Sequence, residues 1–135
     1  GEEHMTPEET IQRVRDAMAA LSRGDIDAAG PLIHPDYSST IRGRASISGT
    51  YHGWEAMAGV LQRLLDMTNG TMNGVPEIVL ADDENVLMYM KVAASRRDGR
   101  TYDSHHVYRF RFKDGLVIEA ETIPVDQEAF KEFYA

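Results

Sequence analysis

The stretch from Tyr102 to Pro124, YDSHHVYRFRFKDGLVIEAETIP, constrains the fold more than any other part of the chain. Two runs that alternate in polarity flank the turn sequence Lys113-Asp114-Gly115, and this pattern predicts two long strands joined by a tight hairpin. Successive side chains of a strand point to opposite faces. One face of the first strand therefore carries Ser104, His106, Tyr108, Phe110 and Phe112. A face that combines aromatic rings with titratable groups can line either a core or a ligand pocket.

The opposite face of the same hairpin is charged. It carries Arg109 and Arg111 on the first strand and Glu119 and Glu121 on the second. Because opposite charges on neighbouring strands can pair across a sheet, we expect these groups to interact. This outer face is solvent-exposed in a monomer, and in a homodimer it becomes the interface between the two sheets. We predict the homodimer.

Composition excludes several classes of partner. The 135 residues include 14 basic and 22 acidic side chains, and the net charge of −8 disfavours binding to nucleic acid. No apolar run reaches the ~20 residues that span a membrane, so we expect no membrane association. The chain has no cysteine, which excludes disulfides and thiolate-bound zinc. With no visible secretory signal, these features favour a cytoplasmic protein.

Three helices are predicted before the β-rich part of the chain. Thr6, Pro7 and Glu9 form a helix start with a capping box, and apolar residues then follow at helical spacing. Asp25 is expected to cap a second, shorter helix that His34-Pro35 ends. A third helix begins at Trp54 and ends near Asn69-Gly70.

Strands account for most of the remainder. We predict a short strand over 36–42, a polar loop over 43–50, and strands over 77–81 and 86–95 before the hairpin, with Asp126 capping a closing helix. Helices grouped before antiparallel strands indicate an α+β domain, with the helices on one face of a curved sheet. We expect one domain over 1–135, in which 1–5 is a tag remnant or disordered.

Three segments carry a family resemblance: ALSRGDIDAAGPLIHPDY, YHGWEAMAGVLQRL and YRFRFKDGLVIEAE. With the element order, they resemble the NTF2-like superfamily, in particular its SnoaL-like and ketosteroid-isomerase-like branch. The resemblance implies a cone-shaped fold in which three N-terminal helices pack on a strongly curved, mainly antiparallel sheet. It also implies a mainly apolar pocket inside the cone and frequent dimerisation.

The residues that carry chemistry in this branch are mostly absent. By resemblance to the steroid isomerases, the helix tyrosine position falls on Ala17, the aspartate base on Thr40 or Ile41, and the strand acid on Tyr108. Only Tyr108 can donate a hydrogen bond. The histidine and aspartate of the related polyketide cyclases have no equivalent at Ile118, Ala120 or Thr122. Steroid isomerisation by the usual aspartate mechanism is therefore disfavoured.

His106 and Tyr108 are the candidate catalytic residues, because a histidine base or acid would stand beside a phenol that can hold an oxyanion. The alternative is a buried polar pair satisfied by backbone or water. The candidate ligand-binding residues are those that the resemblance places at the pocket: Tyr37, Trp54, Met88, Met90, Ser104 and Thr122. Each of these has an ordinary core role as its alternative. We expect no metal, since His105 and His106 point to opposite faces, and no cofactor.

Two functions remain open. The first is a SnoaL-like, cofactor-independent isomerase, cyclase or lyase that acts by proton transfer on a hydrophobic, carbonyl-bearing small molecule. The second is a non-catalytic ligand-binding protein or dimeric scaffold of the same fold, which the missing carboxylates favour. Fold alone does not decide between them.

Overall fold

The computed structural model of the chain describes residues 5–135. Its elements, in chain order, are α1 (Pro7–Ser22), the 3₁₀ helix η1 (Ile26–Leu32), β1 (Ile33–Ile41), β2 (Gly49–His52), α2 (Trp54–Met67), β3 (Asn73–Ala81), β4 (Asn85–Ser95), β5 (Thr101–Lys113), β6 (Leu116–Pro124) and α3 (Gln127–Phe133). The prediction for residues 1–5 lies, apart from Met5, outside the described residues.

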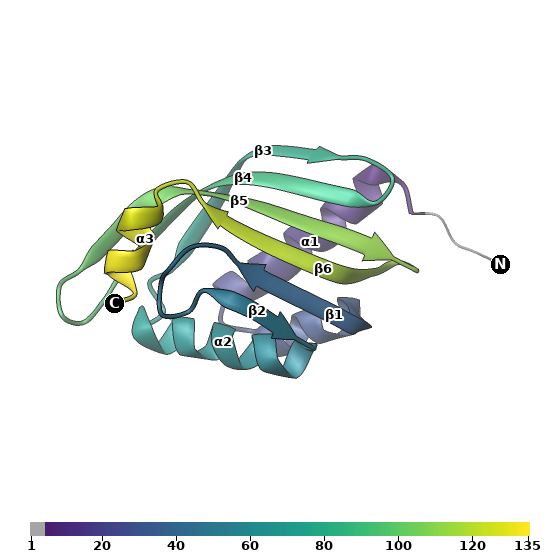
Figure 1. Cartoon of the computed structure of the whole chain (residues 1–135). Helices are drawn as coiled ribbons and strands as arrows, with labels where there is room; N and C mark the ends of the chain where they lie inside the picture. The colour runs from purple at the N-terminus through teal and green to yellow at the C-terminus, as the bar shows by residue number, and fades with distance from the viewer. Residues whose placement is uncertain (1–4) are drawn as a thin grey trace.

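The strands form one curved sheet in the order β2-β1-β6-β5-β4-β3 (Figure 1). Neighbouring strands are antiparallel, except that β1 and β6 run parallel. Helix α1 packs against β3 and β4, α2 packs against β1 and β2, and α3 contacts β5 at one end of the sheet. The predicted α+β fold, with helices packed on a curved and mainly antiparallel sheet, is confirmed. No helix of residues 5–135 has the length and apolar character to span a membrane.

The predicted hairpin is also confirmed, as strands β5 and β6. Its turn places Asp114 and Gly115 at positive φ angles of 53° and 76°, a backbone region that Asp and Gly tolerate better than most residues. The register shifts between Arg111 and Phe112, so Phe112 lies opposite Val117. This irregularity near the turn is a β-bulge, which alters the simple alternation of faces there.

The first third of the chain differs from the prediction. The short second helix is a 3₁₀ helix that contains Pro31, and Asp25 makes no side-chain capping bond. Proline has no N–H and obstructs an α-helix, which explains the tighter and shorter form. Strand β1 begins at Ile33, so Pro35 lies within this strand and not at the end of a helix. The pairing of β1 with β6 is interrupted between Ile33 and Ser38, so the proline position does not have to donate a hydrogen bond to the sheet.

Two strand boundaries were also wrong. Gly49 and Thr50 were assigned to a loop and no strand was predicted for Tyr51 or His52, but Gly49–His52 form the edge strand β2 against β1. This four-residue segment has no apolar alternation, and its pairing with β1 holds it in place. Strand β3 begins at Asn73, four residues before the predicted start. The other two predicted helix caps were correct: Thr6 and Glu9 form the capping box of α1, and Asp126 accepts a hydrogen bond from the Ala129 N–H at 3.0 Å.

Candidate functional site

A cavity of about 190 Å³ lies between the inner face of the sheet and helices α1, η1 and α2. Most of its wall is apolar, with contributions such as Ile41 from β1, Leu64 from α2 and Phe110 from β5. Arg13 is the single charged side chain in the wall, and every described carboxylate lies outside it. A site of this composition favours a hydrophobic ligand with few polar groups.

Three side chains of β5 form a hydrogen-bonded chain at this wall. The Tyr102 hydroxyl lies 2.7 Å from Nε2 of His106, and the Tyr108 hydroxyl lies 3.0 Å from Nδ1 of the same ring. The three residues share a face because four residues separate Tyr102 from His106 and two separate His106 from Tyr108, both even spacings along the strand. His106 and Tyr108 line the cavity, whereas Tyr102 lies behind them.

Burial keeps all three groups uncharged at neutral pH. His106 is 4% exposed, and burial, reinforced by the charge of His105, lowers its pKa to about 4. Burial raises the pKa of Tyr102 to about 12 and also raises that of Tyr108. The site is therefore a chain of neutral hydrogen bonds, with an imidazole that donates at one nitrogen and accepts at the other.

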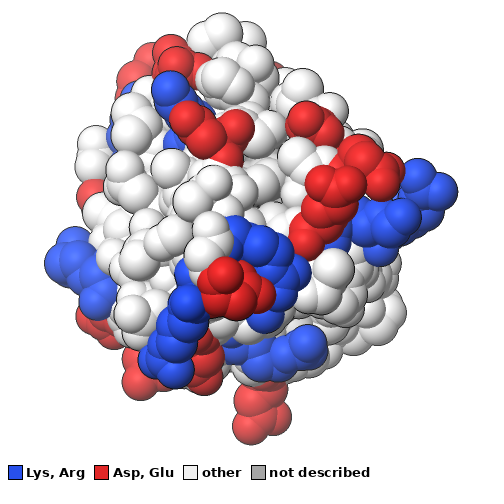
Figure 2. All heavy atoms as spheres, turned by 90° about the vertical axis from the view of Figure 1, so that its left-hand side faces the viewer, with Lys and Arg blue, Asp and Glu red and all other residues white. Residues whose placement is uncertain are grey.

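Helix α3 encloses the Tyr102 end of this chain. The ring of Phe130 meets His106 edge-on at 5.5 Å, and Phe133 packs 5.3 Å from Tyr102. Arg96 and Arg100, next to the β4–β5 turn, donate hydrogen bonds to the Phe133 carbonyl oxygen at 2.9 and 3.2 Å. Figure 2 views this end of the molecule and shows charges of both signs interspersed over it. The aromatic rings of α3 thus cover the Tyr102 end of the polar chain, and Phe130 also lines the cavity.

The structure brings together most of the predicted site residues. Six of them line the cavity: His106, Tyr108, Tyr37, Trp54, Met90 and Thr122. Tyr37 and Trp54 meet in a T-shaped contact with ring centroids 6.1 Å apart. Two predicted ligand contacts lie outside the lining: Met88 is fully buried in the core, and Ser104, which lies between Tyr102 and His106 along β5, is not part of the wall. The functional roles of all these residues stay predictions.

Several residues of the site were not foreseen, among them Tyr102 and Arg13. Tyr102 shares the alternation of Ser104, His106 and Tyr108, so the sequence held a signal for it. Arg13 lies outside the apolar stripe of α1, yet it lines the cavity and its Nη1 donates to the Gly115 carbonyl oxygen at 3.0 Å. That contact joins segments about a hundred residues apart, and no local pattern reports it.

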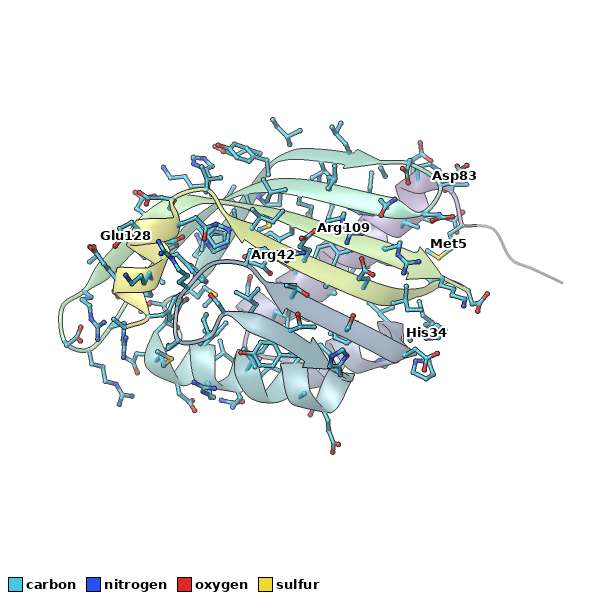
Figure 3. The ribbon with its side chains drawn as sticks, in the orientation of Figure 1. Met5, His34, Arg42, Asp83, Arg109 and Glu128 are labelled. Carbon is cyan, nitrogen blue, oxygen red and sulfur yellow. The ribbon has the colours of Figure 1, made fainter. Side chains whose placement is uncertain are left out.

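The outer face of β5 and β6 carries the predicted ion pairs. Arg109 pairs with Glu119 and, at 3.2 Å, with Glu121, which also accepts from Arg42 at 2.6 Å. Figure 3 shows Arg42 and Arg109 close together over the sheet. The expected cross-strand interaction is confirmed. Hydrogen bonds from Arg109 and Arg111 lower the pKa of Glu119, and those from Arg42 and Arg109 lower the pKa of Glu121. Beside the network, β3 and β4 expose the apolar side chains Val75, Ile78, Leu80 and Leu87.

Comparisons with known proteins agree with this geometry. The sequence profile of the SnoaL-like domain matches residues 14–120. The structure of Bal32a, from a soil-derived mobile gene cassette, is 30% identical, with a TM-score of 0.90 over 96% of this chain and 98% of that one. An NTF2-like protein from Burkholderia xenovorans is 22% identical, with a TM-score of 0.82 over 97% and 99% of the two chains. An uncharacterized protein of Mycobacterium tuberculosis is 25% identical over 97% of this chain and its own full length.

Proposed function

Because this chain belongs to the SnoaL-like family, we propose that its cavity binds a hydrophobic, carbonyl-bearing small molecule and polarises the carbonyl for a proton transfer of the isomerase or cyclase type. The observation that carries the proposal is the hydrogen-bonded chain of Tyr102, His106 and Tyr108 at the wall of an otherwise apolar cavity. A carbonyl oxygen is the ligand group that matches a buried neutral donor.

Tyr108 is the donor in this proposal. When a water molecule in the cavity takes a proton from the carbon next to a carbonyl, negative charge develops on the carbonyl oxygen, and a fixed donor in a largely apolar site stabilises that charge. His106 supports Tyr108 through its hydrogen bond at 3.0 Å. Returning the proton to a different carbon gives an isomer, so the reaction needs no redox partner.

Binding tests the first half of the proposal. Acetophenone and α-methylstyrene have nearly the same shape, but only the ketone can accept a hydrogen bond. We expect the protein to bind acetophenone about fivefold more tightly, since a hydrogen bond contributes about 1 kcal/mol. Tyr108→Phe is expected to abolish this difference, whereas Tyr51→Phe, which removes the hydroxyl of a residue that does not line the cavity, keeps it. Equal binding of both compounds by the unaltered protein would refute the carbonyl site.

One observation favours a second function, ligand binding without chemistry. Both ring nitrogens of His106 are engaged, and no carboxylate within residues 5–135 lines the cavity, so no strong base faces a ligand. Exchange of the acetophenone methyl protons in heavy water separates the two functions. An enzyme accelerates the exchange, and Tyr108→Phe slows it again; a binding protein leaves the rate at that of buffer.

We also propose that two copies associate through the outer sheet face. This association is supported by exposed apolar side chains that lie beside the ion-pair network, namely Val75, Ile78, Leu80 and Leu87. Sedimentation equilibrium is expected to give a dimer, and Leu80→Glu is expected to weaken it. A dimer that Leu80→Glu leaves unchanged would place the contact elsewhere.

A further inference from the structure

His106 has a hydrogen-bonding partner on each ring nitrogen, Tyr102 at Nε2 and Tyr108 at Nδ1. A neutral imidazole carries a single N–H, so it donates from one nitrogen and accepts at the other. The three side chains therefore form a chain with a direction. If Tyr102 donates to Nε2, the hydroxyl hydrogen of Tyr108 is not used within the chain. If Tyr108 donates to Nδ1, the hydroxyl hydrogen of Tyr102 is not used within it.

The two distances favour one direction. Hydroxyl donors make shorter hydrogen bonds than N–H donors, with typical donor–acceptor separations of about 2.7–2.8 Å and 2.9–3.0 Å. The contact at Nε2 is 2.7 Å, which fits a donating Tyr102 hydroxyl. The contact at Nδ1 is 3.0 Å, which fits an N–H that donates to the Tyr108 oxygen.

The surroundings of the two phenols favour the same direction. Tyr102 is 4% exposed and packs against the rings of Phe130 and Phe133, so an unused hydroxyl hydrogen there would face mainly aromatic rings. Tyr108 lines the cavity, where water or a ligand can accept its hydrogen.

We propose that Tyr102 is a positioning residue: it donates to Nε2 of His106, holds the imidazole proton on Nδ1, and so leaves the Tyr108 hydroxyl hydrogen directed into the cavity. The part that concerns a ligand rests on the carbonyl site proposed above. The direction of the chain in the empty protein does not rest on it.

This arrangement makes Tyr108 a stronger donor than an isolated phenol. Each hydrogen bond in a chain polarises the next, so donation from Tyr102 strengthens the Nδ1–H bond to Tyr108, which in turn strengthens the Tyr108 bond to an acceptor. Tyr102 thus acts on a ligand that it does not touch. It also occupies the nitrogen at which His106 would otherwise accept a proton.

Nitrogen NMR of the ligand-free protein with isotope-labelled histidine tests the direction. His106→Asn identifies the resonances of His106, and we expect a protonated Nδ1 and a hydrogen-bonded, unprotonated Nε2. In Tyr102→Phe the Nε2 resonance is expected to move toward that of a nitrogen without a hydrogen bond, while Tyr51→Phe leaves it unchanged. A proton on Nε2 in the unaltered protein would overturn the proposal, and this result needs no variant other than the one used for assignment.

The carbonyl stretching frequency of bound acetophenone tests the transmitted effect. We expect the largest downward shift in the unaltered protein, a smaller one in Tyr102→Phe, and the smallest in Tyr108→Phe. Equal shifts in the unaltered protein and Tyr102→Phe would show that Tyr102 has no influence on the donor. If acetophenone does not bind, the carbonyl site fails, whereas the nitrogen spectrum still decides the role of Tyr102.

Discussion

Strand β5 places two neighbouring histidines in opposite environments. His106 faces the cavity, where its partners are two phenols and its pKa is lowered to about 4 by burial. His105 faces outward, stacks on Tyr89 with ring centroids 4.6 Å apart, and lies 2.6 Å from a carboxylate oxygen of Glu77. The inner face of β5 therefore carries neutral polar groups, whereas charged side chains lie on its outer face and form ion pairs there.

This difference teaches where each face can affect stability and function. A hydrogen bond on the inner face has no water to replace it, so its loss leaves buried polar atoms without partners. The outer ion pairs are partly solvated, and water and salt compensate for most of their loss. Substitutions on the two faces should therefore differ in cost, in pH dependence and in salt dependence.

The largest expected effect comes from removing the imidazole at the centre of the inner chain. His106→Ala leaves both Tyr102 and Tyr108 without their shared partner and opens a void beneath Phe130. We expect the free energy of unfolding to fall by about 4 kcal/mol, measured by urea denaturation. His105→Ala, the matched change on the outer face, is expected to cost about 1 kcal/mol or less. Similar losses for the two variants would contradict the proposed contrast.

Acidification is expected to have the next largest effect. Above the unfolded-state pKa of about 6.5, His106 is neutral in both states and contributes no pH dependence. Between pH about 6.5 and the folded-state pKa of about 4, His106 binds a proton in the unfolded state but not in the folded state. The free energy of unfolding therefore decreases by about 3 kcal/mol in total as the pH is lowered through this range.

The control for acidification is His106→Gln, which cannot titrate but keeps a donor and an acceptor. Carboxylates also titrate in this range, so the quantity to compare is the change in unfolding free energy between pH about 7 and about 4 in the two proteins. The unaltered protein is expected to lose about 3 kcal/mol more than the variant. Parallel curves would mean that His106 is not held neutral by the fold.

Filling the cavity is expected to affect binding more than stability. Ala17 lines the cavity from α1, and Ala17→Leu places a larger apolar side chain in that space. We expect affinity for acetophenone and α-methylstyrene to fall about tenfold alike, as measured by calorimetry, because the added side chain competes with the body of the ligand. Ala19→Leu on the exposed side of the same helix is the control, and equal binding by both variants would locate the ligand outside this cavity.

The smallest expected effect is on the outer face. Arg109→Gln removes the pairs with Glu119 and Glu121 and is expected to cost about 1 kcal/mol or less. The cost should shrink further in high salt, because salt screens partly exposed charges. Lys91→Gln, whose contact with Asp103 spans 4.0 Å between exposed groups, is expected to be neutral. The measurement is made at a protein dilution that dissociates the proposed dimer, and a loss that is large and independent of salt would then contradict the solvation of this face.

Local patterns predicted those elements whose determinants lie close together in the chain. The capping box at Thr6, the turn at Asp114-Gly115 and the cap at Asp126 each depend on residues a few positions apart. Strand β2 and the start of β1 were missed because partners distant in sequence hold them in place, Gly49–His52 by pairing with β1 and Ile33 by pairing with Val117. Such pairing leaves little local signal.

Alternation along β5 was enough to place His106 and Tyr108 side by side on the inner face, and resemblance was enough to suggest a cavity over them. Which nitrogen each phenol contacts, the exclusion of Met88 and Ser104 from the wall, and the entry of Arg13 into it were decided by tertiary structure. The physical reason is the distance along the chain over which the determining interactions act. Periodicity assigns a side chain to a face, but burial, pKa and hydrogen-bond partners depend on what α1, α2 and α3 pack against that face.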